Sequence, residues 1–107
     1  MAKLPKRYMK FFERYPDVGA AYRTLGDAVA DAGPLDAKTR ALVKLAIAVG
    51  ARMEGAVHSH ARRAIEAGAT PDEIRHAVLQ ATTTLGFPGM MAALSWVDDV
   101  LEPKPAE

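Results

Sequence analysis

The chain contains no cysteine among its 107 residues. Without thiols it forms no disulfide, thiolate metal site or iron–sulfur cluster, and it has no cysteine nucleophile. Aromatic residues are also scarce, at 7% of the chain, although 50% of its residues are hydrophobic. The apolar content is therefore mostly aliphatic, which suits closely packed helices and predicts an all-α protein.

Long apolar runs and an excess of charge are missing as well. No stretch reaches the roughly 18 apolar residues that span a bilayer, and the N-terminus lacks the apolar core of a signal peptide. The 14 basic and 13 acidic residues give a net charge of +1. We therefore expect a cytoplasmic protein that binds neither a membrane nor nucleic acid. The one basic run is interpreted as a solvated helix face: Lys3, Lys6, Arg7 and Lys10.

The length is that of one domain, and we expect residues 1–107 to form a single domain. A domain of this size buries a modest share of its surface, so burying more surface in an oligomer would stabilise it.

Apolar periodicity and helix breakers predict about six helices with short connections. The first covers about residues 5–15, and the second begins at Pro16 and is closed by Gly33-Pro34. Asp36 offers a side-chain oxygen to the free amides of a third helix, which we expect to be central and buried. The apolar residues of the second helix are Val18, Ala21, Tyr22, Leu25, Ala28 and Val29, and those of the third are Leu42, Leu45, Ala46 and Val49.

Glycines and a capping sequence predict the later boundaries. Gly50 and Gly55 each weaken a helix by about 1 kcal/mol relative to alanine, so we predict a break near residues 52–55. The next helix ends at Gly68, a left-handed cap. Residues 70–73 (TPDE) then begin another helix with an N-cap, a proline in the first turn and a capping-box glutamate.

The fifth helix carries one apolar stripe: Ile74, Ala77, Val78, Ala81 and Leu85. Residues 86–89 (GFPG) separate it from a last helix over about residues 90–101. Pro103 and Pro105 are expected to end the ordered part of the chain.

Three short segments within residues 35–94 are informative when they are taken in this order: residues 35–42 (LDAKTRAL), 53–60 (MEGAVHSH) and 67–74 (AGATPDEI). Together they resemble the carboxymuconolactone decarboxylase family and its alkylhydroperoxidase D-like branch. The resemblance implies an alkylhydroperoxidase D-like helical bundle. It also implies a homo-oligomer, with a trimer or a hexamer as the expected forms.

In members of the family the first segment often contains a glutamate, and the middle segment often has the sequence Cys-x-x-Cys-x-x-x-His. Here Met53 and Ala56 stand at the cysteine positions and Ala41 stands at the glutamate, whereas His60 matches the histidine. Hydroperoxide reduction by that route needs one thiolate to be oxidised and a second thiol to resolve it. The resemblance therefore predicts the fold without the thiol peroxidase activity.

His60 is the main candidate for a catalytic residue. It shares a helix face with Val57, Ala61 and Ala64, so we expect it to be partly buried. Imidazole titrates near neutral pH and suits a general acid or base acting beside a carbonyl. The alternative is a core histidine whose ring bonds to a backbone carbonyl.

Glu54 and His58 are further catalytic candidates, because their i, i+4 spacing lets a carboxylate orient an imidazole. The alternative is a solvated surface trio with Arg62. His58 and His60 lie about 200° apart on a helix, so they do not serve one ion, and we expect no metal site. His76 lies off the apolar stripe and is expected at the surface.

Thr83, Met53 and Phe87 are the candidates for substrate binding. The resemblance places residues 82–84, all threonines, in a stretch that helps to line the pocket of decarboxylase-like relatives. Methionine and aromatic side chains adapt to apolar ligands. The alternatives are threonines that bond to their own helical turn and apolar side chains that pack in the core or an interface.

Two functional interpretations stay open. In the first, His60 acts on a small carbonyl or lactone substrate in a cysteine-independent, decarboxylase-like lyase reaction that uses no cofactor. In the second, the chain is a non-catalytic homo-oligomeric module that binds a small apolar ligand or serves as a scaffold.

Overall fold

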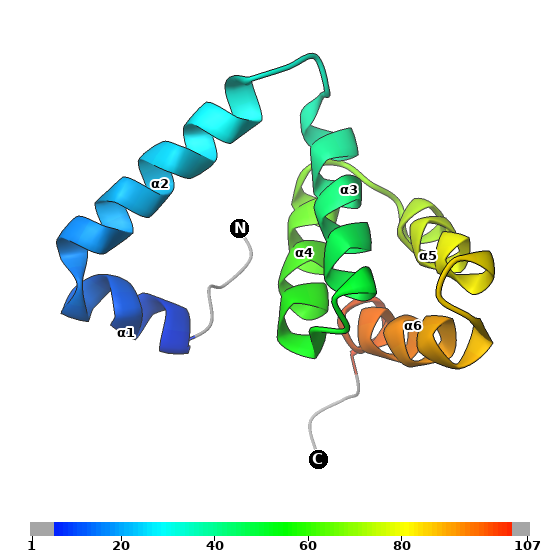
Figure 1. Ribbon diagram of the computed structural model, residues 1–107. Coiled ribbons are helices and arrows are strands. Elements are labelled where there is room, and N and C mark those ends of the chain that lie inside the picture. The colour runs from blue at the N-terminus through cyan, green and yellow to red at the C-terminus, as the bar shows by residue number, and fades with distance from the viewer. Residues whose placement is uncertain (1–5, 104–107) are drawn as a thin grey trace. The chain divides into compact units, whose positions relative to one another are not determined.

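The structure, a computed structural model, describes residues 6–103. Its elements are α1 (Lys6–Arg14), α2 (Pro16–Asp31), α3 (Ala37–Gly50), α4 (Glu54–Glu66), α5 (Pro71–Leu79), the 3₁₀ helix η1 (Gln80–Thr83) and α6 (Phe87–Leu101) (Figure 1). The described part contains no strand, so the predicted all-α fold of about six helices is confirmed. None of these helices is long and apolar enough to cross a membrane.

The chain divides into two compact units, Met1–Asp36 and Ala37–Glu107. The expected single domain stays a prediction. Lys3, Pro5 and Pro105 lie outside the described residues.

The first unit contains α1 and α2, which pack through an aromatic ring. A Cβ atom at Gly19 would overlap Cδ1 of Phe12, so only glycine allows this close approach. The Arg23 guanidinium covers the same ring at 4.6 Å from its centroid, and Tyr8 meets the ring edge to face. Gly19 is the one buried residue of the two helices.

The apolar residues of α2 lie at the surface. Four large side chains at helical spacing, which we call the α2 stripe, are 55–60% exposed: Val18, Tyr22, Leu25 and Val29. Ala21 and Ala28 are exposed as well. The periodicity thus predicted the helix correctly, but the stripe is not part of the core.

The second unit contains the core. Its α3 and α4 run side by side in opposite directions, and α4 and α5 both pack on α6 (Figure 1). Nearly half of the buried residues are alanines, which let the helices approach closely. The buried set is Ala41, Leu45, Ala48, Val49, Val57, Ala61, Ala64, Ala69, Ile74, Val78, Met90, Ala93 and Val97.

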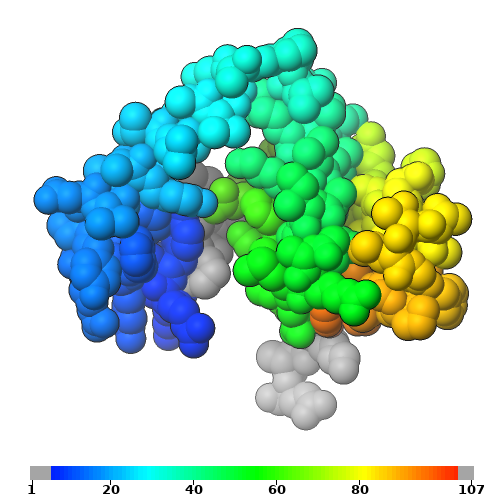
Figure 2. Space-filling model, in the orientation of Figure 1, coloured from blue at the N-terminus to red at the C-terminus, as the bar shows by residue number. Residues whose placement is uncertain are grey.

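Only one face of α3 is buried. Leu45 and Val49 lie in the core as predicted and Leu42 packs against it, but the prediction for Ala46 is wrong because that residue is exposed. Ile47 is 65% exposed. Figure 2 shows α3, in green, on the near face of its unit, where its outer side remains at the surface.

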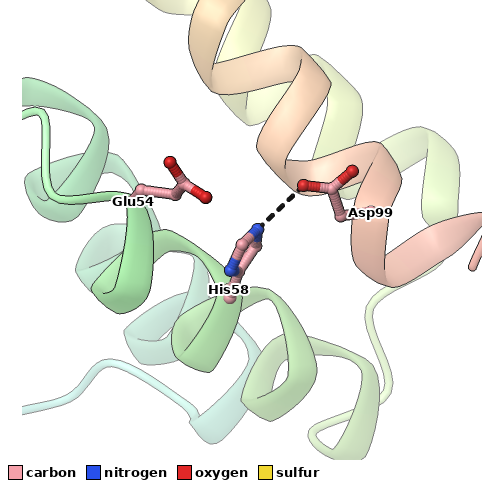
Figure 3. Close-up of side chains that lie close together, drawn as sticks. All are labelled: Glu54, His58 and Asp99. Atoms are coloured by element: carbon pink, nitrogen blue, oxygen red, sulfur yellow. Dashed lines mark hydrogen bonds and ion pairs between the residues drawn. The ribbon is translucent and has the colours of Figure 1, made fainter.

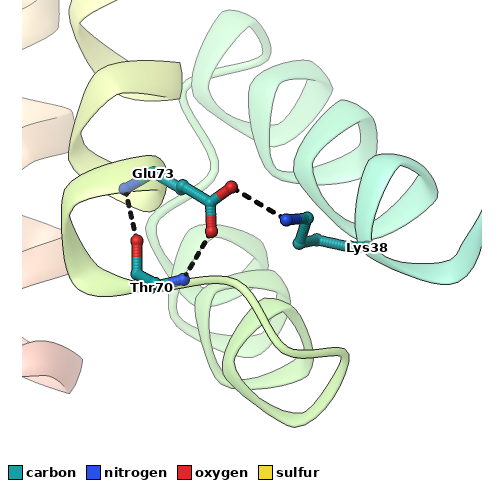
Figure 4. Close-up of polar contacts among 3 residues, drawn as sticks. All are labelled: Lys38, Thr70 and Glu73. Atoms are coloured by element: carbon teal, nitrogen blue, oxygen red, sulfur yellow. Dashed lines mark hydrogen bonds and ion pairs between the residues drawn. The ribbon is translucent and has the colours of Figure 1, made fainter.

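The predicted boundaries between α3 and α5 are confirmed. The chain breaks after Gly50, and Arg52 takes a left-handed φ of 57° before α4 begins. Gly68 has a φ of 97°, which glycine adopts without strain. Thr70 and Glu73 form the expected capping box: each backbone N–H donates to the other side chain (Figure 4).

The end of the chain differs from the prediction in two places. A 3₁₀ turn follows α5, and α6 begins at Phe87 rather than near residue 90. Gly86, at a φ of 101°, precedes the helix, and Pro88 fits its first turn because no N–H is needed there. Arg75 joins α5 to the end of α6 through bonds of 3.1 Å to both Asp98 and Glu102.

Candidate functional site

His60 lies in the middle of α4 and is half-buried. Its helix neighbours Val57, Ala61 and Ala64 are fully buried, as the shared face predicts. The ring Nδ1 is buried and meets no hydrogen-bond partner within residues 6–103. This nitrogen therefore does not support the alternative of a core histidine whose ring bonds to a backbone carbonyl.

The surroundings of His60 favour a neutral ring. Burial lowers the pKa of His60 below its ordinary value of 6.5, and the charges of Arg63 and Lys44 lower that pKa further. Arg63 follows His60 by three residues on α4, whereas Lys44 belongs to α3. At neutral pH the imidazole is thus an uncharged base beside two cations.

The two cations near His60 were not identified from the sequence. The i, i+3 spacing of His60 and Arg63 was available as a signal. Lys44 could not be found in this way, because only the packing of α3 on α4 brings it near.

His58 faces a different helix from His60. Its Nε2 atom lies 3.0 Å from Oδ2 of Asp99 near the end of α6 (Figure 3). Glu54 begins α4 one turn earlier and points toward the same place (Figure 3). Donor atoms of these three residues all lie within 4.8 Å of one another, and His60 is not part of the group. We call Glu54, His58 and Asp99 the α4–α6 cluster.

Two surface pockets, one along α1 and one beside α3, are lined neither by His60 nor by any of the three candidates for substrate binding. Thr83 is exposed, Met53 is 58% exposed and Phe87 is 61% exposed. The Thr82 hydroxyl donates to the carbonyl of Leu79, which matches the alternative of a threonine bonded to its own turn. His76 is exposed, as expected.

A small open pocket lies between α3 and the α5–η1 segment. Its volume is about 230 Å³, and its lining is mostly apolar. The residues that line it are Ala46, Val49, Gly50, Ala77, Gln80, Ala81, Thr84 and Leu85. Thr84 is the one threonine of residues 82–84 that reaches it.

The positions that carry redox groups in the resembled family are apolar here and differ in burial. Ala41 is a core residue of α3, Ala56 packs against the core from α4, and Met53 precedes α4 at the surface. None of these three side chains carries a proton that can be transferred near neutral pH.

A family model and a solved structure that match this chain both point to one protein family. The model of the "Carboxymuconolactone decarboxylase family" matches residues 16–99. A crystal structure of apo-lpg0406, a carboxymuconolactone decarboxylase family protein from Legionella pneumophila, is similar with a TM-score of 0.77 and 26% sequence identity. That similarity covers 90% of this chain and 86% of the other.

An uncharacterized protein of Haemophilus influenzae (strain ATCC 51907 / DSM 11121 / KW20 / Rd) is 42% identical over 59 residues. The aligned part is 55% of this chain and 52% of that protein. The chain therefore spans about half the length of this curated relative.

Proposed function

This chain belongs to the carboxymuconolactone decarboxylase family, and from that premise we propose that His60 acts as a general acid or base on a small carbonyl or lactone substrate. The reaction uses no thiol, because the chain has no cysteine. In the proposed step the neutral imidazole takes a proton from a carbon beside the carbonyl, and the electron pair of the broken C–H bond moves toward the carbonyl oxygen.

The observation that carries this proposal is the state of the His60 ring. Its buried Nδ1 meets no partner within the described residues, and its pKa is lowered by burial and by two cations. A base must be unprotonated at the working pH, and the lowered pKa keeps this imidazole neutral.

The charges of Lys44 and Arg63 support an anionic substrate. Both side chains are exposed, and the charge of each lowers the pKa of His60. They belong to α3 and α4, which pack together. Cations beside a base favour the binding of a carboxylate and stabilise negative charge that develops during proton removal. We therefore expect small lactones or keto acids that carry a carboxylate.

The test compares His60→Gln with His76→Gln on a panel of small lactones and keto acids. General acid–base groups contribute about 10²- to 10⁴-fold to a rate, so the turnover rate of His60→Gln should be lower than that of the wild type by about this factor. His76 is an exposed histidine away from His60, and its variant should keep the wild-type rate. Equal turnover by His60→Gln and the wild type would refute the proposal.

An NMR titration of the histidines gives a second readout. The His60 pKa should lie below 6.5 in the free protein and should move when an accepted ligand is added. A His60 resonance that responds to no member of the panel, together with no turnover by the wild type, would favour the second candidate.

The second candidate is a non-catalytic homo-oligomer, a trimer or a hexamer, in which the α2 stripe packs on another copy of the chain. The observation that favours it is four large apolar side chains, each more than half exposed, on one side of α2. Contiguous apolar patches of this kind mark interaction sites. The pocket beside α3, at about 230 Å³, would hold only a small ligand.

Light scattering at micromolar concentration tests this candidate. The wild type should be oligomeric, and Leu25→Glu should dissociate it because a charge would enter the packed stripe. Thr24→Glu is the matched control, since it adds the same charge one residue away on the exposed surface of α2. A monomeric wild type, or equal dissociation by both variants, would overturn the assignment of the stripe.

A further inference from the structure

The α4–α6 cluster joins two helices that are far apart in the sequence. Glu54 and His58 lie one turn apart at the start of α4, and Asp99 lies 41 residues beyond His58 in the last turn of α6. The imidazole, with 22% of its side chain exposed, points its Nε2 atom at the Asp99 carboxylate (Figure 3). From these positions we propose that Glu54, His58 and Asp99 bind a divalent transition-metal ion of the zinc type.

The types of donor atom indicate which ion would bind. One imidazole nitrogen and two carboxylate oxygens are ligands that zinc and its first-row neighbours accept, whereas magnesium and calcium prefer oxygen alone. Three protein ligands leave a fourth tetrahedral position for water. The site is independent of His60 and of the proposed reaction.

The distances are close to those of a bound ion. Two donors on a tetrahedral zinc ion, each at about 2.0 Å from it, lie about 3.3 Å apart. The pair of His58 and Asp99 already stands at 3.0 Å, and all three donors lie within 4.8 Å. The Glu54 side chain is exposed at the beginning of its helix, so the proposed site requires this side chain to rotate toward the other two donors.

The charge of the cluster also favours a cation. Within residues 6–103 neither Glu54 nor Asp99 pairs with a lysine or an arginine. The adjacent Asp98, by contrast, is neutralised by Arg75 at 3.1 Å. Two carboxylates that face one imidazole leave negative charge that a divalent ion would balance.

Isothermal titration of the chelator-treated protein with zinc chloride tests the proposal. The wild type should bind one ion per chain, and thermal unfolding should shift to higher temperature, because an ion that binds only the folded state stabilises it. Asp99→Asn, Glu54→Gln and His58→Ala should each weaken binding by at least about tenfold, since even residues that only support a metal ligand are worth 10- to 100-fold.

His76→Ala is the matched control, because it removes an exposed imidazole from α5 and should leave zinc affinity unchanged. Cobalt(II) should bind with the visible absorption of a tetrahedral site, and this absorption should be lost in Asp99→Asn. Circular dichroism of each variant separates a lost site from a lost fold. Failure of the wild type to bind zinc below millimolar concentration would overturn the proposal. Unchanged affinity in both Asp99→Asn and His58→Ala, or magnesium binding as tight as zinc binding, would also overturn it.

Discussion

Replacing Thr70 with alanine removes one half of the capping box of α5. The Thr70 hydroxyl oxygen accepts a bond of 3.1 Å from the backbone N–H of Glu73, and the Glu73 carboxylate accepts one of 2.9 Å from the backbone N–H of Thr70. The substitution loses the first of these bonds. Loss of an N-cap side chain costs about 1 kcal/mol, within a range of about 0.5–2 kcal/mol.

The cost should appear in the unfolding of the whole second unit, because Ile74 and Val78 of α5 are fully buried in its core. For a domain of roughly 60–100 residues, 1 kcal/mol lowers the melting temperature by about 4–8 °C. Thermal unfolding followed by circular dichroism measures this shift, and urea unfolding gives the free energy.

Two variants control the Thr70→Ala measurement. Thr70→Ser keeps a hydroxyl acceptor and should stay within about 0.5 kcal/mol of the wild type. Thr24→Ala makes the same chemical change in the exposed middle of α2, where the hydroxyl only bonds back to Ala20. It should be neutral or slightly stabilising, because alanine is the better helix former. Equal losses in Thr70→Ala and Thr70→Ser would refute the capping argument.

Three further predictions concern burial, close packing and protonation. Leu45→Ala should destabilise the protein by about 2–5 kcal/mol in urea unfolding, because Leu45 is fully buried, whereas Ile47→Ala on the exposed side of the same helix should stay within about 0.5 kcal/mol. Similar losses in both would contradict the assignment of the buried face. Gly19→Ala should speed hydrogen exchange of α1 and α2, since its Cβ would meet the Phe12 ring, but Gly26→Ala, with open space around it, should slow exchange by favouring the helix. Slower exchange in both variants would argue against the close contact. The His60 pKa is lower in the folded protein than in the unfolded chain, where it is about 6.5, so the unfolded state binds more protons. The free energy of unfolding should therefore fall as the pH drops from about 6.5 through the folded pKa. Urea unfolding at several pH values should show a weaker decline in His60→Gln than in the wild type. Identical pH profiles of the two proteins would count against a buried neutral ring.

Local chemistry explains why many boundaries were predictable. The capping box at Thr70 and Glu73 and the left-handed Gly68 satisfy backbone groups within a few residues, so their sequence signals suffice. The start of α6 was misplaced because Pro88 was interpreted as part of a break. In the structure it occupies the first helical turn, where proline is well tolerated.

Contacts between distant segments explain what the sequence could not predict. Helical spacing separated His58 from His60, but it could not identify Asp99 or Lys44 as the groups near these rings. Periodicity places a residue on a face without saying which helix covers that face. The same limit applies to the α2 stripe, whose spacing predicted a helix while its exposure depends on packing alone.

The arrangement of the core also bears on how fast the chain folds. Within residues 6–103 the buried hydrophobic residues all lie between Ala41 and Val97. Three residues join α3 to α4, and four join α4 to α5. The largest helix interface therefore forms between segments that adjoin in the chain, so little loop-closure entropy is lost before apolar contacts form. Domains dominated by such local contacts fold on a timescale of about microseconds to milliseconds, which leaves apolar segments little time to associate with other chains before folding.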